Sequence, residues 1–216
     1  MKIFLDTGDP DAIRKAAASG LVDGVTTNPS HIAKTGKPFR EVVEEICSIL
    51  PNGSISVEAM GETKDELISE ARKIAALSPN IVVKIPMNFE GLKAVPILVK
   101  EYGIRTNVTM VFSSTQVFLA MKAGTTYVSV VVSRLDAIAN ESDILVRDAV
   151  TIKENYGFST EVLVASLKTQ NHVLTALRSA ADIMTIPDSL FFQMYKHILT
   201  DAGLAQFKLD WQKVPK

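Results

Sequence analysis

The sequence predicts an α/β protein, a single (β/α)8 barrel (TIM barrel) that spans residues 1–216 and has an additional C-terminal helix. Short apolar segments alternate with amphipathic segments almost from end to end, which is typical of strands and helices in a parallel sheet. Eight such units in 216 residues fit a barrel at the small end of its size range. No strand precedes a GxGxxG motif, which disfavours the alternative of an open doubly wound sheet.

The predicted strands are rich in Val, Ile and Thr, are too short for helices, and are bounded by Gly, Pro, Asn or Ser. They span residues 2–6, 22–28, 54–60, 81–86, 104–111, 126–132, 160–166 and 181–187. We expect all eight to pair in parallel, because each is separated from the next by a helical segment.

The segments between the strands repeat apolar residues at helical spacing. The first of them, DPDAIRK, also has an Asp cap and a Pro in the first turn. The predicted helices span residues 9–20, 39–50, 62–77, 89–103, 113–124, 143–157, 169–181 and 188–199. A further helix over 204–214 has an apolar face, formed by Leu204, Phe207 and Trp211, that we expect to dock on the barrel or on a neighbouring subunit.

Composition and charge exclude several classes of protein. Hydrophobic residues make up 47%, charged residues 22%, and the formal net charge is −1 with no basic block, so we expect neither nucleic acid nor a membrane surface as a partner. The N-terminus MKIFLDTGD does not resemble a signal peptide, and no apolar run approaches a membrane span. Cys47 is the single cysteine, which excludes an intrachain disulfide. These features predict a cytoplasmic protein.

Polar residues follow the predicted strands at the end where barrels of this kind have their active sites. Taken singly, Thr26 or Ser129 is better explained by structure than by function. The ionisable Asp6, Glu58 and Lys84 are different, because they would meet at one mouth, either as a buried ion-pair network or as catalytic groups. The polar strand-end residues include Asp6, Thr26, Asn28, Glu58, Lys84, Asn107, Thr109, Ser129, Arg134, Ser166 and Lys168.

Lys84 interrupts the apolar strand IVVKIP, where a charge is costly unless it is paired or neutralised. A free lysine titrates at about 10.4, and burial among apolar residues favours the neutral, nucleophilic amine. Such an amine condenses with a ketone to form a Schiff base, whose iminium accepts electrons when the C3–C4 bond breaks. Two carboxylates, here Asp6 and Glu58, would serve the proton transfers.

Other chemistries fit the sequence poorly. The three histidines are scattered and show no metal-binding spacing, so we expect no metal site. His31 alone lies near the mouth, and we expect surface or packing roles for His31, His172 and His197. Neither a nucleotide-binding glycine loop nor a GxSxG elbow occurs.

Over essentially its whole length the sequence resembles the small transaldolase and fructose-6-phosphate aldolase family. The resemblance implies a (β/α)8 barrel with Schiff-base chemistry, no metal or organic cofactor, and a homo-oligomer that is often a decamer of two stacked pentameric rings. The matching segments are FLDT (4–7), GVTTNPS (24–30), VVKIP (82–86), TNVTMVF (106–112), AGTTYVS (123–129), SRLD (133–136), VLVASLK (162–168) and LDWQK (209–213).

The resemblance also implies roles for individual residues. Lys84 matches the Schiff-base lysine, Asp6 the acid–base group for the C4 hydroxyl, and Glu58 with Thr109 the pair that holds the catalytic water. The residues that match or adjoin the substrate-binding set are Thr26, Asn28, Asn107 and Ser129 around the dihydroxyacetone unit, and Arg134, Ser166 and Lys168 around the distal phosphate.

The two branches of this family differ near the catalytic water. The aldolase branch has Gln where this chain has Glu58 and Tyr where it has Val131, so the sequence sides with transaldolases. It departs from the usual transaldolase wording in having Val130 and Val131 in place of Pro-Phe, Ser133 in place of Gly, and Lys168 in place of Arg. These departures cluster around the anion pocket.

The sequence therefore favours a transaldolase that moves a dihydroxyacetone unit from a ketose with an anion on C6, either fructose 6-phosphate or 6-deoxy-6-sulfofructose. Its acceptor would be an aldose phosphate such as glyceraldehyde 3-phosphate or erythrose 4-phosphate. Two alternatives stay open: an aldolase that releases free dihydroxyacetone, and a sugar-binding barrel without catalysis.

Overall fold

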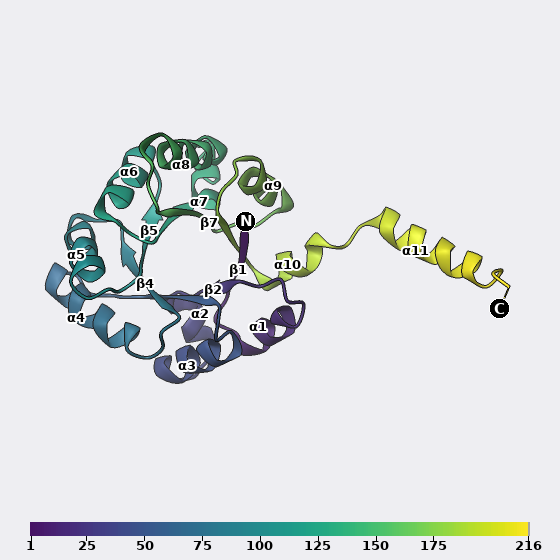
Figure 1. Cartoon of the computed structure of the whole chain (residues 1–216), viewed down its shortest axis with the longest axis horizontal. Helices are drawn as coiled ribbons and strands as arrows, with labels where there is room; N and C mark the ends of the chain where they lie inside the picture. Colours follow the sequence, from purple (N-terminus) through teal and green to yellow (C-terminus); the bar gives the residue numbers. More distant parts are fainter. Residues whose placement is uncertain (216) are drawn as a thin grey trace.

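The strands close into a parallel barrel, which confirms the predicted fold class. A computed structural model of the chain describes residues 1–215. The strands follow one another around the barrel in chain order, and β8 pairs with β1 to close it (Figure 1). They are β1 Lys2–Asp6, β2 Gly24–Thr26, β3 Ser54–Glu58, β4 Ile81–Pro86, β5 Thr106–Val111, β6 Tyr127–Val131, β7 Glu161–Ala165 and β8 Ile183–Ile186. Each strand begins and ends within two residues of its predicted bounds.

Helices form a ring around the outside of this barrel (Figure 1). They are α1 Pro10–Ala17, α2 Pro29–Lys34, α3 Phe39–Ile49, α4 Lys64–Ala75, α5 Phe89–Lys100, α6 Ser114–Ala123, α7 Val132–Asp136, α8 Ser142–Tyr156, α9 Gln170–Arg178 and α10 Asp188–Met194, followed by α11 Ile198–Trp211. Among residues 1–215, none of these helices has the length and apolarity that a membrane crossing requires.

Two short helices, α2 and α7, were not predicted. They have six and five residues, which is too few to show an apolar repeat over two turns. The side chain of Asn28 caps α2, and Pro29 occupies its first turn. Helix α7 follows β6 directly. Because both come after the C-terminal end of a strand, they place side chains at the mouth of the barrel.

The predicted helix over 188–199 is wrong, because the chain breaks it into two. Helix α10 ends at Met194, and α11 begins after His197, whose Nδ1 accepts a hydrogen bond from the Leu199 amide. Helix α11 extends away from the barrel and contributes no buried residue (Figure 1). The additional C-terminal helix is thus confirmed, although it spans residues 198–211 and not the predicted 204–214, and within one copy it does not dock on the barrel.

An apolar layer fills the lower part of the barrel interior. It consists of Phe4, Val82, Tyr127, Leu163 and Ile183, all at most 4% exposed. The rings of Phe4 and Tyr127 meet edge to face, with centroids 6.0 Å apart. Side chains two positions apart in a strand point the same way. Asp6, two positions after Phe4, and Lys84, two positions after Val82, therefore lie on the C-terminal side of this layer. The layer is therefore the floor of any cavity at the C-terminal mouth.

Candidate active site

A cavity of about 550 Å³ opens at the C-terminal ends of the strands. It brings together ten of the eleven predicted site residues, which come from seven strands or the segments that follow them. They are Asp6, Thr26, Asn28, Glu58, Lys84, Thr109, Ser129, Arg134, Ser166 and Lys168. The predicted convergence at one mouth is therefore what the structure shows.

The charge of Lys84 is paired. In the parallel register Lys84 lies beside Glu58 of β3, and the Lys84 Nζ is 2.9 Å from Glu58 Oε2. Nζ also donates a hydrogen bond of 2.9 Å to the carbonyl oxygen of Thr27. Lys84 is only 8% exposed, so these two contacts compensate for the burial of its charge.

This pair has the geometry of a nucleophile and its base. The Glu58 carboxylate can take a proton from Nζ directly, and the freed amine would then face the cavity. Thr109, in β5 on the other side of Lys84, also lines the cavity and offers a hydroxyl. The buried ion pair that the sequence left as one alternative is therefore present, and both of its partners line the cavity.

Asp6 lies at the end of β1 and lines the same cavity. The Oδ1 atom of Asp6 accepts a 3.0 Å hydrogen bond from the Thr26 hydroxyl and lies 3.5 Å from His31 Nε2. The Thr26 hydroxyl is also 2.7 Å from the Thr185 hydroxyl. Burial by itself raises the pKa of the Asp6 carboxyl, but His31, the Thr26 hydroxyl and the charge of Lys84 together lower this pKa below its ordinary value. Asp6 is therefore a carboxylate at neutral pH and is able to accept a proton.

The amide residues are placed differently from one another. Asn28 lines the cavity, and its Oδ1 accepts a hydrogen bond from the His31 amide at 2.9 Å. Asn107 is completely buried below the cavity wall, where its Oδ1 accepts a 2.7 Å hydrogen bond from the Ser129 hydroxyl and its Nδ2 donates to Ser56. Asn107 is the predicted site residue that the structure does not place on the wall; it holds Ser129, which is on the wall.

Two cations and two hydroxyls gather at the other side of the mouth. Arg134 comes from α7, while Ser166 and Lys168 follow β7. Ser166 has a φ of 62°, a left-handed conformation that costs a non-glycine residue about 1–3 kcal/mol and that clusters at functional sites. Its hydroxyl is 2.7 Å from the Ser133 hydroxyl. Within residues 1–215 no carboxylate lies within ion-pairing distance of Arg134 or Lys168, so this group can receive an anion.

The sequence analysis missed several residues of the site. Met110, in the left-handed region at φ 63° where the β5–β6 register shifts, lines the cavity, and its Sδ lies 3.7 Å from Arg134 Nη1. His172 has more than a surface role: its Nδ1 accepts the Lys168 amide at 3.0 Å, and its Nε2 lies 2.8 Å from Asp136. His172 thereby ties the loop after β7 to α7. Its position three residues into a helix gave no sign of this contact.

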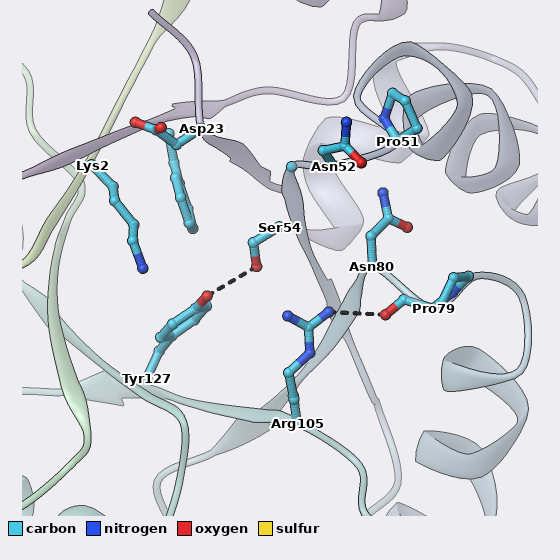
Figure 2. Close-up of a pocket in the computed structure, with 11 residues that line it drawn as sticks. Lys2, Asp23, Pro51, Asn52, Ser54, Pro79, Asn80, Arg105 and Tyr127 are labelled. Atoms are coloured by element: carbon cyan, nitrogen blue, oxygen red, sulfur yellow. Dashed lines mark hydrogen bonds between the residues drawn. The ribbon is translucent and has the colours of Figure 1, made fainter.

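A second cavity, of about 450 Å³, lies at the opposite end of the barrel. Figure 2 shows the Tyr127 hydroxyl directed at Ser54 and Arg105 directed at the carbonyl of Pro79. Lys2, at its rim, is ion-paired with Glu161. The polar groups of this cavity are thus engaged in contacts within the protein. In barrels of this kind, residues at this end usually contribute to stability and not to catalysis. Residues 1–215 also contain no cluster of three or more His, Cys, Asp or Glu side chains arranged to hold a metal.

Fold and cavity together define a (β/α)8 barrel whose mouth combines a paired lysine, a second carboxylate and an anion-receptive group. Residues 3–216 match the family described as transaldolase/fructose-6-phosphate aldolase. The chain belongs to this family of enzymes.

Its relatives include a probable transaldolase of Geobacter metallireducens, 51% identical over 216 residues and covering 100% of both chains. A probable transaldolase of Dictyoglomus turgidum is 49% identical with the same coverage. One of Myxococcus xanthus is 51% identical and covers 100% of this chain and 96% of the relative. These full-length matches place the chain among transaldolase-type enzymes.

Similar solved structures share the fold alone. A putative phosphonomutase from Burkholderia cenocepacia has a TM-score of 0.62 at 14% identity, over 95% of this chain and 92% of the other. The orotidine 5'-monophosphate decarboxylase from Methanocaldococcus jannaschii has a TM-score of 0.58 at 16% identity, over 86% and 87%. Such low identities indicate nothing about the reaction.

Proposed function

We propose that the enzyme is a transaldolase that transfers a dihydroxyacetone unit through a Schiff base on Lys84. The donor is a ketose with an anion on C6, fructose 6-phosphate or 6-deoxy-6-sulfofructose. The acceptor is an aldose phosphate such as glyceraldehyde 3-phosphate or erythrose 4-phosphate. The observation that carries this proposal is the buried Lys84–Glu58 pair at the mouth of the cavity, with Asp6 on the same wall. The names of the relatives support it.

The first half of the reaction forms the Schiff base. Glu58 takes a proton from Lys84, and the amine attacks the C2 carbonyl of the ketose to give a carbinolamine. Glu58, with a water held by Thr109, returns a proton to the carbinolamine oxygen, which leaves as water. The result is an iminium between Nζ and C2, an electron sink separated from the C3–C4 bond by the C2–C3 bond alone.

The second half breaks and remakes a carbon–carbon bond. Asp6 takes the proton of the C4 hydroxyl, the C3–C4 electron pair moves into the iminium, and an aldehyde leaves. The enamine on Lys84 then attacks the carbonyl carbon of the acceptor, whose oxygen takes the proton back. Asn28 and Ser129 hold the dihydroxyacetone hydroxyls; the position of both on the cavity wall, and the hydrogen bond from Ser129 to Asn107, support this role. Hydrolysis of the new iminium releases the product.

The anion on C6 is received by Arg134, Ser166 and Lys168, with Ser133 as an additional hydroxyl. Phosphate and sulfonate both present three acceptor oxygens, and a guanidinium, an ammonium and hydroxyls suit either of them. Phosphate has a charge of about −1.5 to −2 at neutral pH, whereas sulfonate has a single charge. The hydroxyls of Ser133 and Ser166, which contact each other, add neutral hydrogen-bond donors, and these suit a singly charged anion well. We therefore propose both fructose 6-phosphate and 6-deoxy-6-sulfofructose as donor sugars.

The activity is tested by supplying each ketose with and without glyceraldehyde 3-phosphate. We expect transfer to the acceptor to be much faster than release of free dihydroxyacetone. Val131, at the end of β6, lines the cavity without the phenol of the aldolase branch, which supports this expectation. Release of free dihydroxyacetone without an acceptor at the same rate as transfer would instead indicate an aldolase. Binding of the ketose without turnover would indicate a sugar-binding barrel.

Arg134→Ala tests the anion pocket. We expect kcat/KM to fall by about 10²-fold for both anionic donors, since a charge-assisted hydrogen bond is worth roughly 1.5–3 kcal/mol. For unsubstituted fructose we expect little change. Arg147→Ala, on the outer helix α8 and ion-paired with Asp143, is the matched control. Equal losses for charged and uncharged donors would remove Arg134 from this role.

We also propose that the enzyme is a homo-oligomer in which α11 packs on a neighbouring copy. Helix α11 exposes Leu204, Phe207 and Trp211 at 55–75% of their surfaces on one face, and it contributes nothing to its own core. An apolar face of this kind usually marks an interface. Light scattering should give a multimer for the wild type and for Lys208→Ala, and a smaller species for Phe207→Asp. A monomeric wild type would contradict the proposal.

A further inference from the structure

His31 lies between the active-site cavity and a neighbouring cavity of about 400 Å³, and it lines both. It belongs to α2, the short helix that the sequence analysis missed. Its side chain is 24% exposed, and its Nε2 is 3.5 Å from Oδ1 of Asp6. The ring therefore connects the proposed acid–base group to the space beside the active site.

The position of His31 is fixed from two sides. Its amide donates a 2.9 Å hydrogen bond to Oδ1 of Asn28, which caps the helix. The loop after β1 lies directly on its backbone: a Cβ at Gly8 would come within 2.9 Å of the carbonyl carbon and oxygen of His31. The chain segment that carries Asp6 thus continues into the loop that contacts His31, so the two side chains are held together.

Other charged groups line the two cavities that flank His31, and the carboxylates among them other than Asp6 have partners of their own. On the side of the neighbouring cavity are Asp9, Asp11, Lys34, Lys37 and Glu45. Asp9 caps α1, Asp11 pairs with Arg14, and Glu45 pairs with Lys37 at 3.0 Å.

On the side of the active site are Asp6, Glu58, Lys84, Arg134 and Lys168. Glu58 is paired with Lys84. Within the described 1–215, Asp6 is the only carboxylate within ion-pairing distance of the His31 ring.

The proposed reaction makes a demand that Asp6 alone meets poorly. The proton taken from the C4 hydroxyl must be kept until an acceptor aldehyde arrives. The pKa of Asp6 is raised by burial but lowered overall by His31, Thr26 and Lys84, so a proton on this carboxyl is readily lost at neutral pH. An imidazole is a stronger base than a carboxylate, so the ring of His31, 3.5 Å from Oδ1 of Asp6, is the better holder of this proton.

We propose that His31 is a positioning residue that holds the transferred proton for Asp6. This inference rests on the proposed function. Asp6 removes the C4 hydroxyl proton as the C3–C4 bond breaks, and neutral His31 takes that proton, leaving an imidazolium beside an aspartate carboxylate. When the enamine attacks the acceptor, the proton returns through Asp6 to the new C4 oxygen. No proton is gained or lost over the cycle.

The test compares wild type with His31→Leu and His31→Gln in single turnovers of fructose 6-phosphate and, separately, 6-deoxy-6-sulfofructose. Borohydride trapping measures Schiff-base formation, and aldehyde release measures C3–C4 cleavage. We expect both variants to trap as much adduct as wild type, which also shows that they are folded. Cleavage at pH 7 should be roughly tenfold slower, less than the 10²–10⁴-fold loss of a direct acid–base group.

The pH profile separates proton holding from a structural role. Because only a neutral imidazole can take the proton, wild-type cleavage should rise with pH between 5 and 8, where imidazoles titrate. In both variants this rise of the cleavage rate with pH should be absent. Full activity in His31→Gln, which donates an N–H but holds no proton, would overturn the inference, as would superimposable profiles. A wild type that traps no adduct with either ketose would overturn the proposed function itself, and the inference with it.

Discussion

Lys84→Ala is expected to lose all covalent labelling and all measurable transfer. In the wild type, borohydride and a ketose donor should reduce the iminium and add a stable sugar adduct to the peptide containing Lys84. Lys84→Arg should be equally inactive, because a guanidinium does not lose its proton in the working range. Peptide mass spectrometry after trapping is the measurement.

The matched control for this substitution is Lys2→Ala. Lys2 is also a strand lysine in an ion pair, with Glu161, but it lies at the opposite end of the barrel. It should keep wild-type labelling and transfer. Adduct that persists unchanged in Lys84→Ala would place the nucleophile elsewhere and remove the basis of the proposed reaction.

Asp6 and Glu58 are expected to affect different steps, each by roughly 10²–10⁴-fold. Asp6→Ala should still trap the Schiff base with the intact sugar but should cleave it very slowly, because Asp6 acts after the iminium has formed. Glu58→Ala should slow formation of the adduct, because the ammonium of Lys84 loses the carboxylate 2.9 Å away that takes its proton. Rapid-quench trapping and aldehyde release resolve the two steps.

The pH dependence of Asp6 has a definite sign. A carboxyl whose pKa is lowered stays ionised until the solution becomes more acidic than usual, so the base form is present throughout the neutral range. Loss of cleavage through Asp6 itself should therefore begin only at a pH more acidic than the one at which an ordinary aspartate carboxyl titrates. Rapid cleavage by Asp6→Ala, or equal slowing of trapping in both variants, would contradict this division of roles.

The strands were predictable because they are short, mostly buried and rich in Val, Ile and Thr, so they stand out between the amphipathic helical segments. The helix at the C-terminus was harder, since MYKHIL continues the apolar pattern of α10 while the chain actually turns at Tyr195–His197. Helices α2 and α7 could not be found by period, because five or six residues do not complete two turns. Their presence is determined by caps and by the strands they follow.

The site was predictable to the extent that it depends on strand ends. Lys84, Asp6 and Glu58 could be placed at one mouth because parallel strands bring their C-terminal ends together. The sequence also placed His31 near the mouth, but its contact with Asp6 could not be predicted, because it depends on the unpredicted helix α2. Met110 could not be placed there, since its position depends on a left-handed backbone at a register shift. The spacing of residues in the sequence also could not show that Asn107 lies completely buried below the cavity wall, because this depends on how side chains stack inside the barrel.

The apolar layer of Phe4, Val82, Tyr127, Leu163 and Ile183 gives the two ends of the barrel separate evolutionary freedom. Above it, side chains can change to admit another sugar while the interior that stabilises the barrel is left intact. Below it, the Tyr127–Ser54 and Lys2–Glu161 contacts can be replaced to raise thermal stability without touching a group that meets substrate. An engineer who wishes to alter the donor anion can therefore work on α7 and the loop after β7 and recover lost stability at the opposite end.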